Sequence, residues 1–502
     1  MTSLECPRSS RGIKWLLLAM MLPFGAIVAS RWTVPPSAAE GDYAQYLLHA
    51  KAIVEGRPYT DIGYIHTDMN WVGPQAQPPG WPLVLAPFVA VFGTDSQVFK
   101  GLVTVLVAVF AMLAGWYFVR RGEPVVGIAT ALVVPVAIET EFGTSSALSD
   151  PLFCVLVWLT FLVADGDNLH GWRRGLMLAV LCVAAISVRV AGVALPPALL
   201  LQALMTRRDH GLKVILPLAL LVVAGGVFAL MGGDHIPFIG KTFRIMSSPS
   251  ELAGTYGPAI GTAALYPFAS NRLDDAYHAV TAIPLLVGAV VLVRQNVRSV
   301  IPLFVLTYAA LLALSPVREA RYAWPLFPLV MACITMGFLW LGNRYLVRVH
   351  RLMPRLVLAF VAAVTIGATV QVMQKPARAS LLGDADTREL FDWVSVNGAT
   401  TPMRVVFTNP RVMTLETHVP AMGIPVGEPE KVIDELERKN ITHVVIPRRF
   451  TRSGERRLAA IVSERAAQFP PVFGNAGHEV YRFIAHPAPA ADSGIAFLPA
   501  RR

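Results

Sequence analysis

The chain is dominated by long apolar runs that short polar segments separate. A helix that crosses the hydrocarbon core of a bilayer needs about 20 predominantly apolar residues. Seven runs approach this length and predict membrane-spanning helices. They are Ile13–Ser30, Val98–Val119, Val214–Met231, Ala279–Val293, Val300–Ser315, Ala323–Leu341 and Leu356–Met373.

Two further stretches each contain two apolar runs that charged residues interrupt. Pro124–Ala164 is broken by an acidic cluster that includes Glu141 and Asp150, and Gly175–Met205 is broken by Arg189. Each stretch could form one broken span or a hairpin of two short spans. With two hairpins, about eleven spans and a cytoplasmic N-terminus, the inside segments hold 16 basic and 5 acidic residues. The positive-inside rule therefore favours this topology, with an external C-terminus.

The pattern changes near residue 375, where strand-like and helix-like segments alternate. Two segments rich in β-branched residues predict strands, two amphipathic segments predict helices, and the last segment predicts a strand or hairpin. In that order they are Met403–Phe407 and Thr442–Ile446, Glu428–Lys439 and Gly454–Ala467, and Val472–Phe483. We therefore expect an α-helical polytopic membrane domain over residues 1–374 and a small external α/β domain over residues 375–502.

Charge supports this division. The 502 residues carry a net charge of +10 and only 15% are charged, against roughly 25% in ordinary soluble domains. Residues 375–502 hold 17 basic and 14 acidic residues, the density of a soluble domain, whereas the first 374 residues hold 26 and 19. This composition excludes a cytosolic globular enzyme, a disordered chain and a disulfide scaffold. Since 16 of those 26 basic residues lie in predicted inside segments, the positive charge is a topology signal and predicts no nucleic-acid partner.

The cysteines agree with this topology, and we expect the protein in the inner (plasma) membrane. Cys6 falls in the predicted cytoplasmic tail, and Cys154, Cys182 and Cys333 fall in predicted spans. No external segment contains a cysteine, so the sequence predicts no external disulfide.

Two predicted external loops are long, residues 31–100 and 232–276, and long loops in compact proteins tend to carry function. In the first loop, apolar residues recur at helical spacing from Tyr43 to Val54, and Gly56 and Pro58 stop the pattern. This predicts a short amphipathic helix along the membrane surface. Asp42 begins the helix, either as an N-cap with Gln45 in a capping box or as a general base. The two roles are compatible.

A second short apolar segment begins at Gln77-Pro78-Pro79-Gly80 and ends at Phe92-Gly93. It contains about 14 residues, too few to cross a bilayer comfortably, and predicts a re-entrant or surface helix.

Several short motifs occur in a recognisable order along the chain. They are Asp42 after the first span, Tyr46, Ala50, Glu55-Gly56, Pro78-Pro79-Gly80, Phe92-Gly93, Ser149-Asp150-Pro151-Leu152-Phe153, and the segment from Arg318 to Pro328 with its Arg-Tyr pair. In this order the sequence resembles the GT-C glycosyltransferases. It is most similar to bacterial relatives of protein O-mannosyltransferases and of lipid A aminoarabinose transferases, over roughly residues 10–375.

The resemblance implies a sugar donor linked to a polyprenyl phosphate and transfer on the external face. The acceptor would be a glycan, lipid or protein of the cell envelope. It also implies that Asp42 is catalytic. Many relatives have two adjacent acids at this point, whereas this chain has Asp42-Tyr43, which puts a role that needs both acids in doubt.

This chemistry needs a base for the acceptor hydroxyl and cations for the leaving phosphate. Arginine suits the phosphate because its guanidinium pairs with two oxygens at once. Arg189 and Arg321 are candidates to contact this phosphate, because they lie where predicted spans begin or end. The alternative for each is that the side chain reaches a lipid headgroup. The further substrate-binding candidates are Arg318, Tyr322, Tyr46, Lys51 and His66.

A divalent metal is an open possibility, with Asp42, His66 and Glu141 as candidate ligands. The acids around Glu141 equally fit a polar loop between two hairpin spans. Four aromatic residues could stack on sugar rings or belong to an interfacial belt. They are Tyr59, Tyr64, Trp71 and Trp81.

Two other function classes fit the same composition. A transporter or flippase of lipid-linked sugars would be as apolar, but such proteins often contain internal repeats, and none is visible here. A non-catalytic assembly partner is the other alternative.

Overall fold

The computed structural model describes residues 10–32, 41–67, 73–74, 77–141, 147–166, 169–206, 215–220, 249–263, 271–315, 319–346, 348, 350–374 and 384–485. The chain forms two compact units. The first contains Met1–Pro36 and Ala76–Arg378, and the second contains Ser37–Gln75 and Ala379–Arg502. The first loop, which we assigned to the membrane domain, is thus divided, and its middle part belongs with the C-terminal residues.

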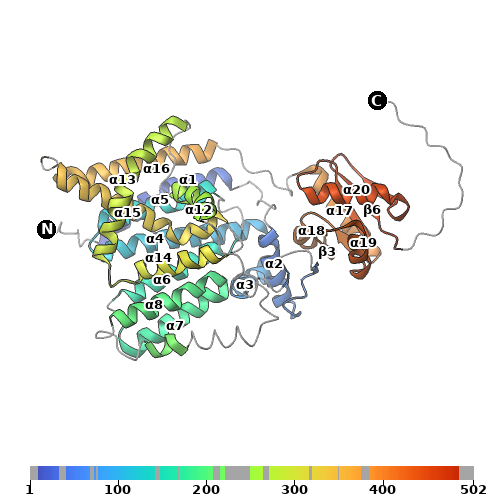
Figure 1. Cartoon of the computed structure of the whole chain (residues 1–502), viewed down its shortest axis with the longest axis horizontal. Helices are drawn as coiled ribbons and strands as arrows, with labels where there is room; N and C mark the ends of the chain where they lie inside the picture. The colour runs from blue at the N-terminus through green and yellow to red at the C-terminus, as the bar shows by residue number, and fades with distance from the viewer. Residues whose placement is uncertain are drawn as a thin grey trace, which may run out of the picture. The chain divides into compact units, whose positions relative to one another are not determined.

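The first unit is helical throughout its described residues. Figure 1 shows α4, α5, α6, α14 and α15 as neighbouring rods of one bundle. The elements are α1 (Ser10–Arg31), α3 (Gly80–Phe92), α4 (Ser96–Arg120), α5 (Pro124–Glu141), α6 (Asp150–Ala164), α7 (Gly171–Val188), η2 (Val190–Ala194), α8 (Leu195–Met205), α12 (Pro249–Ala263), α13 (Asn271–Gln295), α14 (Val300–Leu314), η3 (Ala320–Leu326), α15 (Phe327–Tyr345), η4 (His350–Leu352) and α16 (Met353–Gln374).

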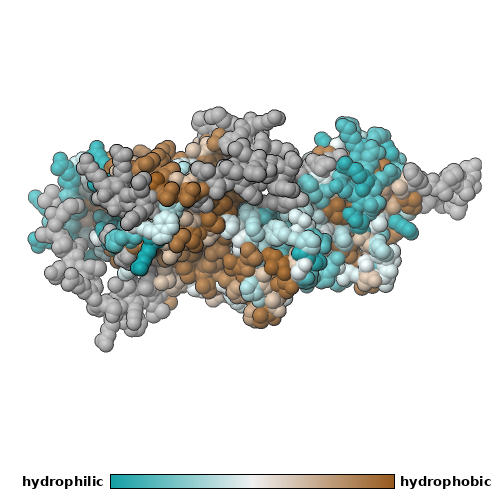
Figure 2. Space-filling model, turned by 90° about the horizontal axis from the view of Figure 1, so that it is seen from below, coloured by the Kyte–Doolittle hydropathy of each residue, from teal (hydrophilic) through white to brown (hydrophobic). Residues whose placement is uncertain are grey.

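Within the described residues, five helical segments are long and apolar enough to cross a membrane. They are Ser96–Arg120, Gly171–Val188, Tyr277–Gln295, Ala320–Tyr345 and His350–Gln374. Apolar side chains on these helices are exposed, such as Val105 at 58% and Leu286 at 69%, and Figure 2 shows extensive apolar surface on the helical unit. Exposed apolar surface of this extent suits contact with lipid.

Both interrupted stretches form two separate helices: α5 and α6 in one, α7 and α8 in the other. The short segment after Pro79 forms α3 and ends at Gly93, whose φ of 64° favours glycine. Most of the predicted span Val214–Met231 lies outside the described residues. The total of about eleven spans remains a prediction.

Helices α13 and α15 approach closely through two glycines. A Cβ atom at Gly288 would overlap the carbonyl of Cys333, and one at Gly337 would overlap the carbonyl of Pro284. Small residues allow membrane helices to pack backbone against backbone. These two glycines therefore set the distance between α13 and α15.

The second unit is an α/β structure. Its elements are α2 (Gly41–Val54), β1 (Tyr64–Ile65), α17 (Ala385–Thr400), β2 (Val405–Val406), α18 (Pro410–Thr417), β3 (Ala421–Met422), α19 (Pro429–Arg438), β4 (His443–Pro447), α20 (Ser453–Glu464), η6 (Ala466–Gln468), β5 (Pro471–Gly474) and β6 (His478–Arg482). The strands form one sheet in the order β1-β3-β2-β4-β6-β5. The first four strands are parallel, and β4, β6 and β5 are antiparallel.

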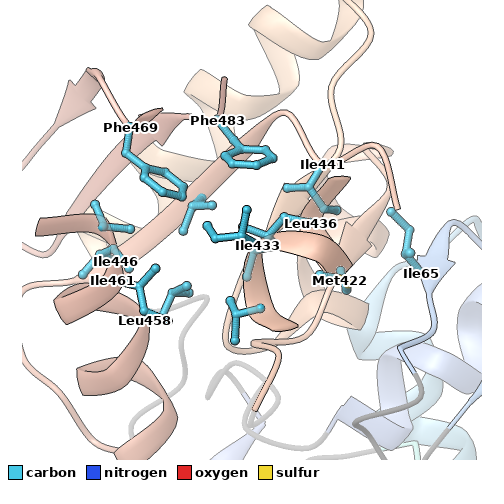
Figure 3. Close-up of a cluster of buried hydrophobic side chains, with 14 residues drawn as sticks. Ile65, Met422, Ile433, Leu436, Ile441, Ile446, Leu458, Ile461, Phe469 and Phe483 are labelled. Carbon is cyan, nitrogen blue, oxygen red and sulfur yellow. The ribbon is translucent and has the colours of Figure 1, made fainter. Parts of the chain in front are cut away.

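The sequence predicted β2, β4, α19, α20 and the β5–β6 hairpin. It did not predict β3, α18 or the entry of β1 from the first loop into the sheet. Tyr64 and Ile65 of β1 pair with Ala421 and Met422. Figure 3 shows Ile65 and Met422 in the same apolar cluster, which α19 covers with Ile433 and Leu436. The first loop thus completes the core of the C-terminal unit.

Helix α2 matches the predicted amphipathic helix in extent but not in environment. It ends at Val54, and Gly56 follows with a φ of 66°. Nine of its residues are buried, including the polar Gln45 and His49. Helix α18 packs against it. The burial of Gln45 and His49 contradicts the expectation that this helix buries only an apolar face. Its place along the membrane surface remains a prediction.

Candidate functional sites

The first unit contains a cluster of buried charges. Asp150 begins α6, Arg189 lies between α7 and η2, and Arg321 lies in η3. A guanidinium nitrogen (Nη1) of Arg189 lies 2.6 Å from Asp150 Oδ2, and Nη1 of Arg321 lies 3.8 Å from the same oxygen. The side chains of Asp150, Arg189 and Arg321 are only 3%, 14% and 5% exposed. The structure therefore brings together two arginines that the sequence proposed separately.

Neighbouring side chains hold the two arginines in place. Arg189 donates a hydrogen bond to Ser149 Oγ at 3.2 Å, and Arg321 pairs with the carboxylate of Glu319. The ring of Tyr322 lies 4.9 Å from Arg189 Cζ and 5.8 Å from Arg321 Cζ, within the range of a cation–π contact. The cluster thus contains two cations, two carboxylates and an aromatic ring.

Buried hydrogen bonds fix the 3-10 turn that carries Arg321. Tyr308 donates its hydroxyl to the carbonyl of Tyr322 at 2.8 Å, and Trp158 donates its indole N–H to the carbonyl of Pro325 at 3.1 Å. Asp150 lies in the first turn of α6, where the helix dipole favours a carboxylate. These contacts give the cluster a defined geometry before any ligand arrives.

The second unit contains the other predicted acid. Asp42 is the second residue of α2, and its Oδ1 accepts a hydrogen bond from Nη1 of Arg411 at 3.0 Å. The same nitrogen donates to Oε1 of Gln45 at 2.7 Å. Gly41 makes room for this contact, because a Cβ atom there would lie 2.6–2.7 Å from the guanidinium atoms of Arg411.

His49 extends this network one helical turn further. Its side chain is fully buried, its Nδ1 lies 2.8 Å from the carbonyl oxygen of Tyr59, and its ring stacks on that of Tyr59 with centroids 4.1 Å apart. Nε2 of His49 lies 3.3 Å from Nε2 of Gln45. Burial lowers the pKa of His49 to about 4, so the ring is neutral at ordinary pH and can accept from the Gln45 amide. Residues 42, 45 and 49 form one polar stripe on α2.

Gln45 therefore has a different role from the one predicted. We expected it to complete a capping box with Asp42. Its amide instead contacts Arg411, His49 and the carbonyl of Gly73. Asp42 lies within the helix and points its carboxylate at Arg411.

The remaining substrate-binding candidates are buried, paired within the protein or outside the described residues. Tyr46 is 3% exposed, and Lys51 lies 3.8 Å from Glu55 and 3.3 Å from Nδ1 of His418. His66 follows β1 and is partly buried. Arg318 lies outside the described residues.

The aromatic candidates for sugar stacking mostly have partners within the protein. Tyr59 stacks on His49, and Arg411 lies 5.9 Å from the ring centre of Tyr64. Trp81 is fully buried and donates its indole N–H to the carbonyl of Ala147 at 2.8 Å. Trp71 lies outside the described residues.

Among the described residues, the candidate metal ligands do not lie together. Among the described residues, no group of three or more His, Cys, Asp or Glu side chains could hold a metal ion. The carboxylate of Asp42 contacts the guanidinium of Arg411, a group that cannot bind a metal. The side chain of Glu141 lies outside the described residues. Cys154, Cys182 and Cys333 are free, buried thiols.

Comparison with known proteins gives a result at the level of fold. No protein-family profile and no curated protein matches the sequence. Among solved structures, the chain is similar to ArnT from Cupriavidus metallidurans bound to undecaprenyl phosphate, with a TM-score of 0.59 and 13% identity. That match covers 96% of this chain and 100% of ArnT. The chain has the GT-C fold.

A second group of similar structures belongs to the archaeal oligosaccharyltransferase AglB from Archaeoglobus fulgidus. The complex with an inhibitory peptide and a dolichol-phosphate matches with a TM-score of 0.54 and 12% identity, over 88% of this chain and 70% of AglB. The complex with Zn and sulfate matches with a TM-score of 0.55 and 13% identity, over 93% of this chain and 72% of AglB. The predicted fold class, a helical polytopic membrane protein with a small C-terminal sheet, is thereby confirmed, apart from the number of spans and the external placement of the C-terminal domain, which remain predictions.

Proposed function

We propose that this protein is a membrane glycosyltransferase that moves a sugar from a polyprenyl-phosphate donor to a hydroxyl of a cell-envelope glycan, lipid or protein. The observation that supports this best is the buried pair Arg189 and Arg321 in a GT-C fold. Solved examples of that fold include ArnT with undecaprenyl phosphate and AglB with a dolichol-phosphate. We place the reaction on the external face of the inner (plasma) membrane, with the N-terminus in the cytoplasm.

In this proposal the two arginines bind the phosphate of the donor. The carbon–oxygen bond between the sugar and the phosphate breaks, and the phosphate leaves with the electron pair. Two fixed guanidinium groups stabilise that negative charge better than water does, because they need no reorganisation. Glu319 is 37% exposed and Asp150 only 3%. The phosphate would therefore displace Glu319 from Arg321 more easily than it would displace Asp150.

Asp42 is the proposed general base. A hydroxyl oxygen of the acceptor attacks the anomeric carbon of the sugar, and its proton passes to the carboxylate of Asp42. Arg411 holds one oxygen of that carboxylate at 3.0 Å, which fixes the direction of the carboxylate. General-base catalysis of this kind contributes about 10²–10⁴-fold in rate.

The test uses the full-length protein in liposomes with a radiolabelled polyprenyl-phosphate sugar and an envelope extract as acceptor. Asp42→Asn should lower transfer by about 10²–10⁴-fold while the protein remains folded. Asp61→Asn is the matched control, because Asp61 belongs to the same loop and is 61% exposed. That variant should retain full activity.

Two results would contradict the proposal in different ways. Full activity of Asp42→Asn would remove the assignment of the base. Movement of the sugar across the liposome membrane without a new glycosidic bond would favour a transporter or flippase of lipid-linked sugars.

A further inference from the structure

The helical unit contains a pocket between the ends of α4 and α6, two helices that pack side by side. Its volume is about 270 Å³. The lining residues are Tyr117, Arg120, Arg121, Leu162, Asp165 and Gly166. Asp150 begins α6, and the pocket lies at the other end of that helix. Since α6 has 15 residues and a helix rises about 1.5 Å per residue, the pocket is about 22 Å from the charge cluster of the proposed donor site.

The charges that line this pocket do not cancel. Nη1 of Arg121 lies 3.6 Å from Oδ2 of Asp165, and its guanidinium lies 5.5 Å from the ring centre of Tyr117. Arg120 is exposed, and its guanidinium makes no hydrogen bond or ion pair within the described residues. It lies beside Gly166, where a Cβ atom would be 3.5 Å from both of its terminal nitrogens. Two guanidinium groups and one carboxylate give the pocket a net charge of +1.

The single carboxylate of the pocket is engaged within the protein. Asp165 is 5% exposed and accepts hydrogen bonds from the hydroxyl of Tyr117 and from the side-chain amide of Gln202, each at 2.6 Å. These neutral donors orient the carboxylate but leave its charge, which Arg121 balances from 3.6 Å. The guanidinium of Arg120 is therefore the charge that remains for a ligand.

An exposed apolar stripe on α4 leads to Arg120. Its side chains are those of Val105, Val109, Met112 and Trp116, and all four are exposed. Their spacing of four, three and four residues keeps them on one side of the helix, and Arg120 follows four residues after Trp116. Helix α4 is long and apolar enough to cross a membrane. The stripe thus suits contact with lipid chains, and it ends at a tryptophan, which is typical of the membrane interface.

A cation in the last turn of a helix is favourable by itself, so the two arginines alone would not indicate a site. The pocket beside them and the apolar stripe that ends there match the two parts of a phospholipid. We propose that this pocket binds the phosphate of an anionic membrane phospholipid, with Arg120 and Arg121 as the charged contacts and the acyl chains along the stripe of α4. Arginine pairs with phosphate oxygens in a bidentate manner.

The predicted topology agrees with such a ligand. Arg120 and Arg121 belong to the predicted inside segments, which hold 16 basic and 5 acidic residues. The cytoplasmic leaflet is rich in anionic lipids, and basic pockets between membrane helices on that side bind their headgroups. Binding at this pocket does not depend on the proposed transfer activity.

The test measures lipid binding to the full-length protein in detergent by native mass spectrometry. The probes are phosphatidylglycerol, phosphatidylcholine with the same acyl chains, and glycerol 3-phosphate, which has the phosphate without the chains. We expect phosphatidylglycerol to bind about 10–30-fold more tightly than phosphatidylcholine, because each basic side chain near a lipid surface contributes about five-fold. Glycerol 3-phosphate should bind about tenfold or more weakly than phosphatidylglycerol, because it lacks the apolar contacts.

Three variants locate the site. Arg120→Gln and Arg121→Gln should each reduce the preference for phosphatidylglycerol about five-fold. Trp116→Ala should weaken both lipids about 2–10-fold and leave the preference unchanged, since it removes an aromatic contact and no charge.

Two further variants are controls. Arg294→Gln should keep the wild-type preference, because Arg294 is an exposed arginine in the last turn of α13 that does not line the pocket. Asp42→Asn should also bind lipid as the wild type does, which separates this site from the proposed transfer reaction.

The proposal is overturned if phosphatidylglycerol binds no more tightly than phosphatidylcholine. Equal binding of glycerol 3-phosphate and phosphatidylglycerol would indicate a free phosphate as the ligand and would overturn the assignment to lipid. The site is misplaced if Arg120→Gln and Arg121→Gln both keep the wild-type preference, or if Arg294→Gln reduces that preference as much as they do.

Discussion

Replacement of Asp150 by asparagine tests the charge cluster of the helical unit directly. Asp150 is 3% exposed and is shared by Arg189 at 2.6 Å and Arg321 at 3.8 Å. Removal of one partner from a buried ion pair costs about 3–5 kcal/mol, because the other charge stays buried without compensation. Arg189 keeps the hydroxyl of Ser149, and Arg321 keeps Glu319. We therefore expect the lower end of that range, about 3 kcal/mol, or about 100-fold in the unfolding equilibrium.

The buried thiols provide the assay. Cys154, Cys182 and Cys333 lie in α6, α7 and α15 and are buried, so a maleimide labels them only when the helical unit opens. A Cys6→Ser background removes the thiol of the N-terminal tail. Labelling in mild detergent over a series of SDS concentrations should show Asp150→Asn opening well before the wild type.

Glu319→Gln is the control for the loss of a carboxylate beside Arg321. Glu319 is 37% exposed, and exposed ion pairs contribute about 0–1 kcal/mol. Labelling of Asp150→Asn at the same SDS concentration as the wild type would refute the reasoning. The reasoning would also be refuted if Glu319→Gln shifted the labelling as far as Asp150→Asn does.

Three further predictions concern single positions. Gly41→Ala should push the guanidinium of Arg411 away from the candidate base, so transfer should fall several-fold while the thermal midpoint of unfolding changes little; unchanged activity would show that this contact is dispensable. The pKa of His49 is about 4 when folded and about 6.5 when unfolded, so the unfolded chain binds more protons between these values. Stability should therefore fall by up to about 3 kcal/mol as pH decreases from 6.5 to 4, and thermal melts of His49→Gln should show a weaker pH dependence. Gly337→Ala places a methyl group against the backbone of Pro284 and should destabilise the helical unit by about 1–3 kcal/mol, measured by the same thiol labelling.

Helices of the first unit were predictable because their signal is local. Apolar runs of about 20 residues form helices in a bilayer, since a helix satisfies its backbone hydrogen bonds within one segment. The interruptions at Asp150 and Arg189 correctly marked helix ends. The meeting of these two residues with Arg321 was not predictable, because nothing in the spacing of residues 150, 189 and 321 indicates which helix ends are adjacent.

The environment of Asp42 was the least predictable part of the candidate site. The Asn409-Pro410 pair is a typical helix start, so α18 had a local signal that β-rich patterning nearby obscured. Arg411 in α18 contacts Asp42, which lies 369 residues earlier in the chain. No local sequence pattern indicated that these two residues would meet. Strands β1, β2 and β3 contain two residues each, which is too short for a hydrophobic alternation to be visible. Long-range pairing, rather than local propensity, determines this part of the fold.

The pairing of β1 with β3 has a consequence for the order of biosynthesis. Tyr64 and Ile65 are made early, but their partners Ala421 and Met422 follow only after the helical unit has been synthesised. Until then the first loop lacks its neighbours in the sheet, and Asp42 lacks Arg411. A chain that stops before residue 400 would insert its helices yet never assemble the surroundings of its candidate base. The proposed chemistry would therefore become possible only after the strand-forming residues of the second unit have been synthesised.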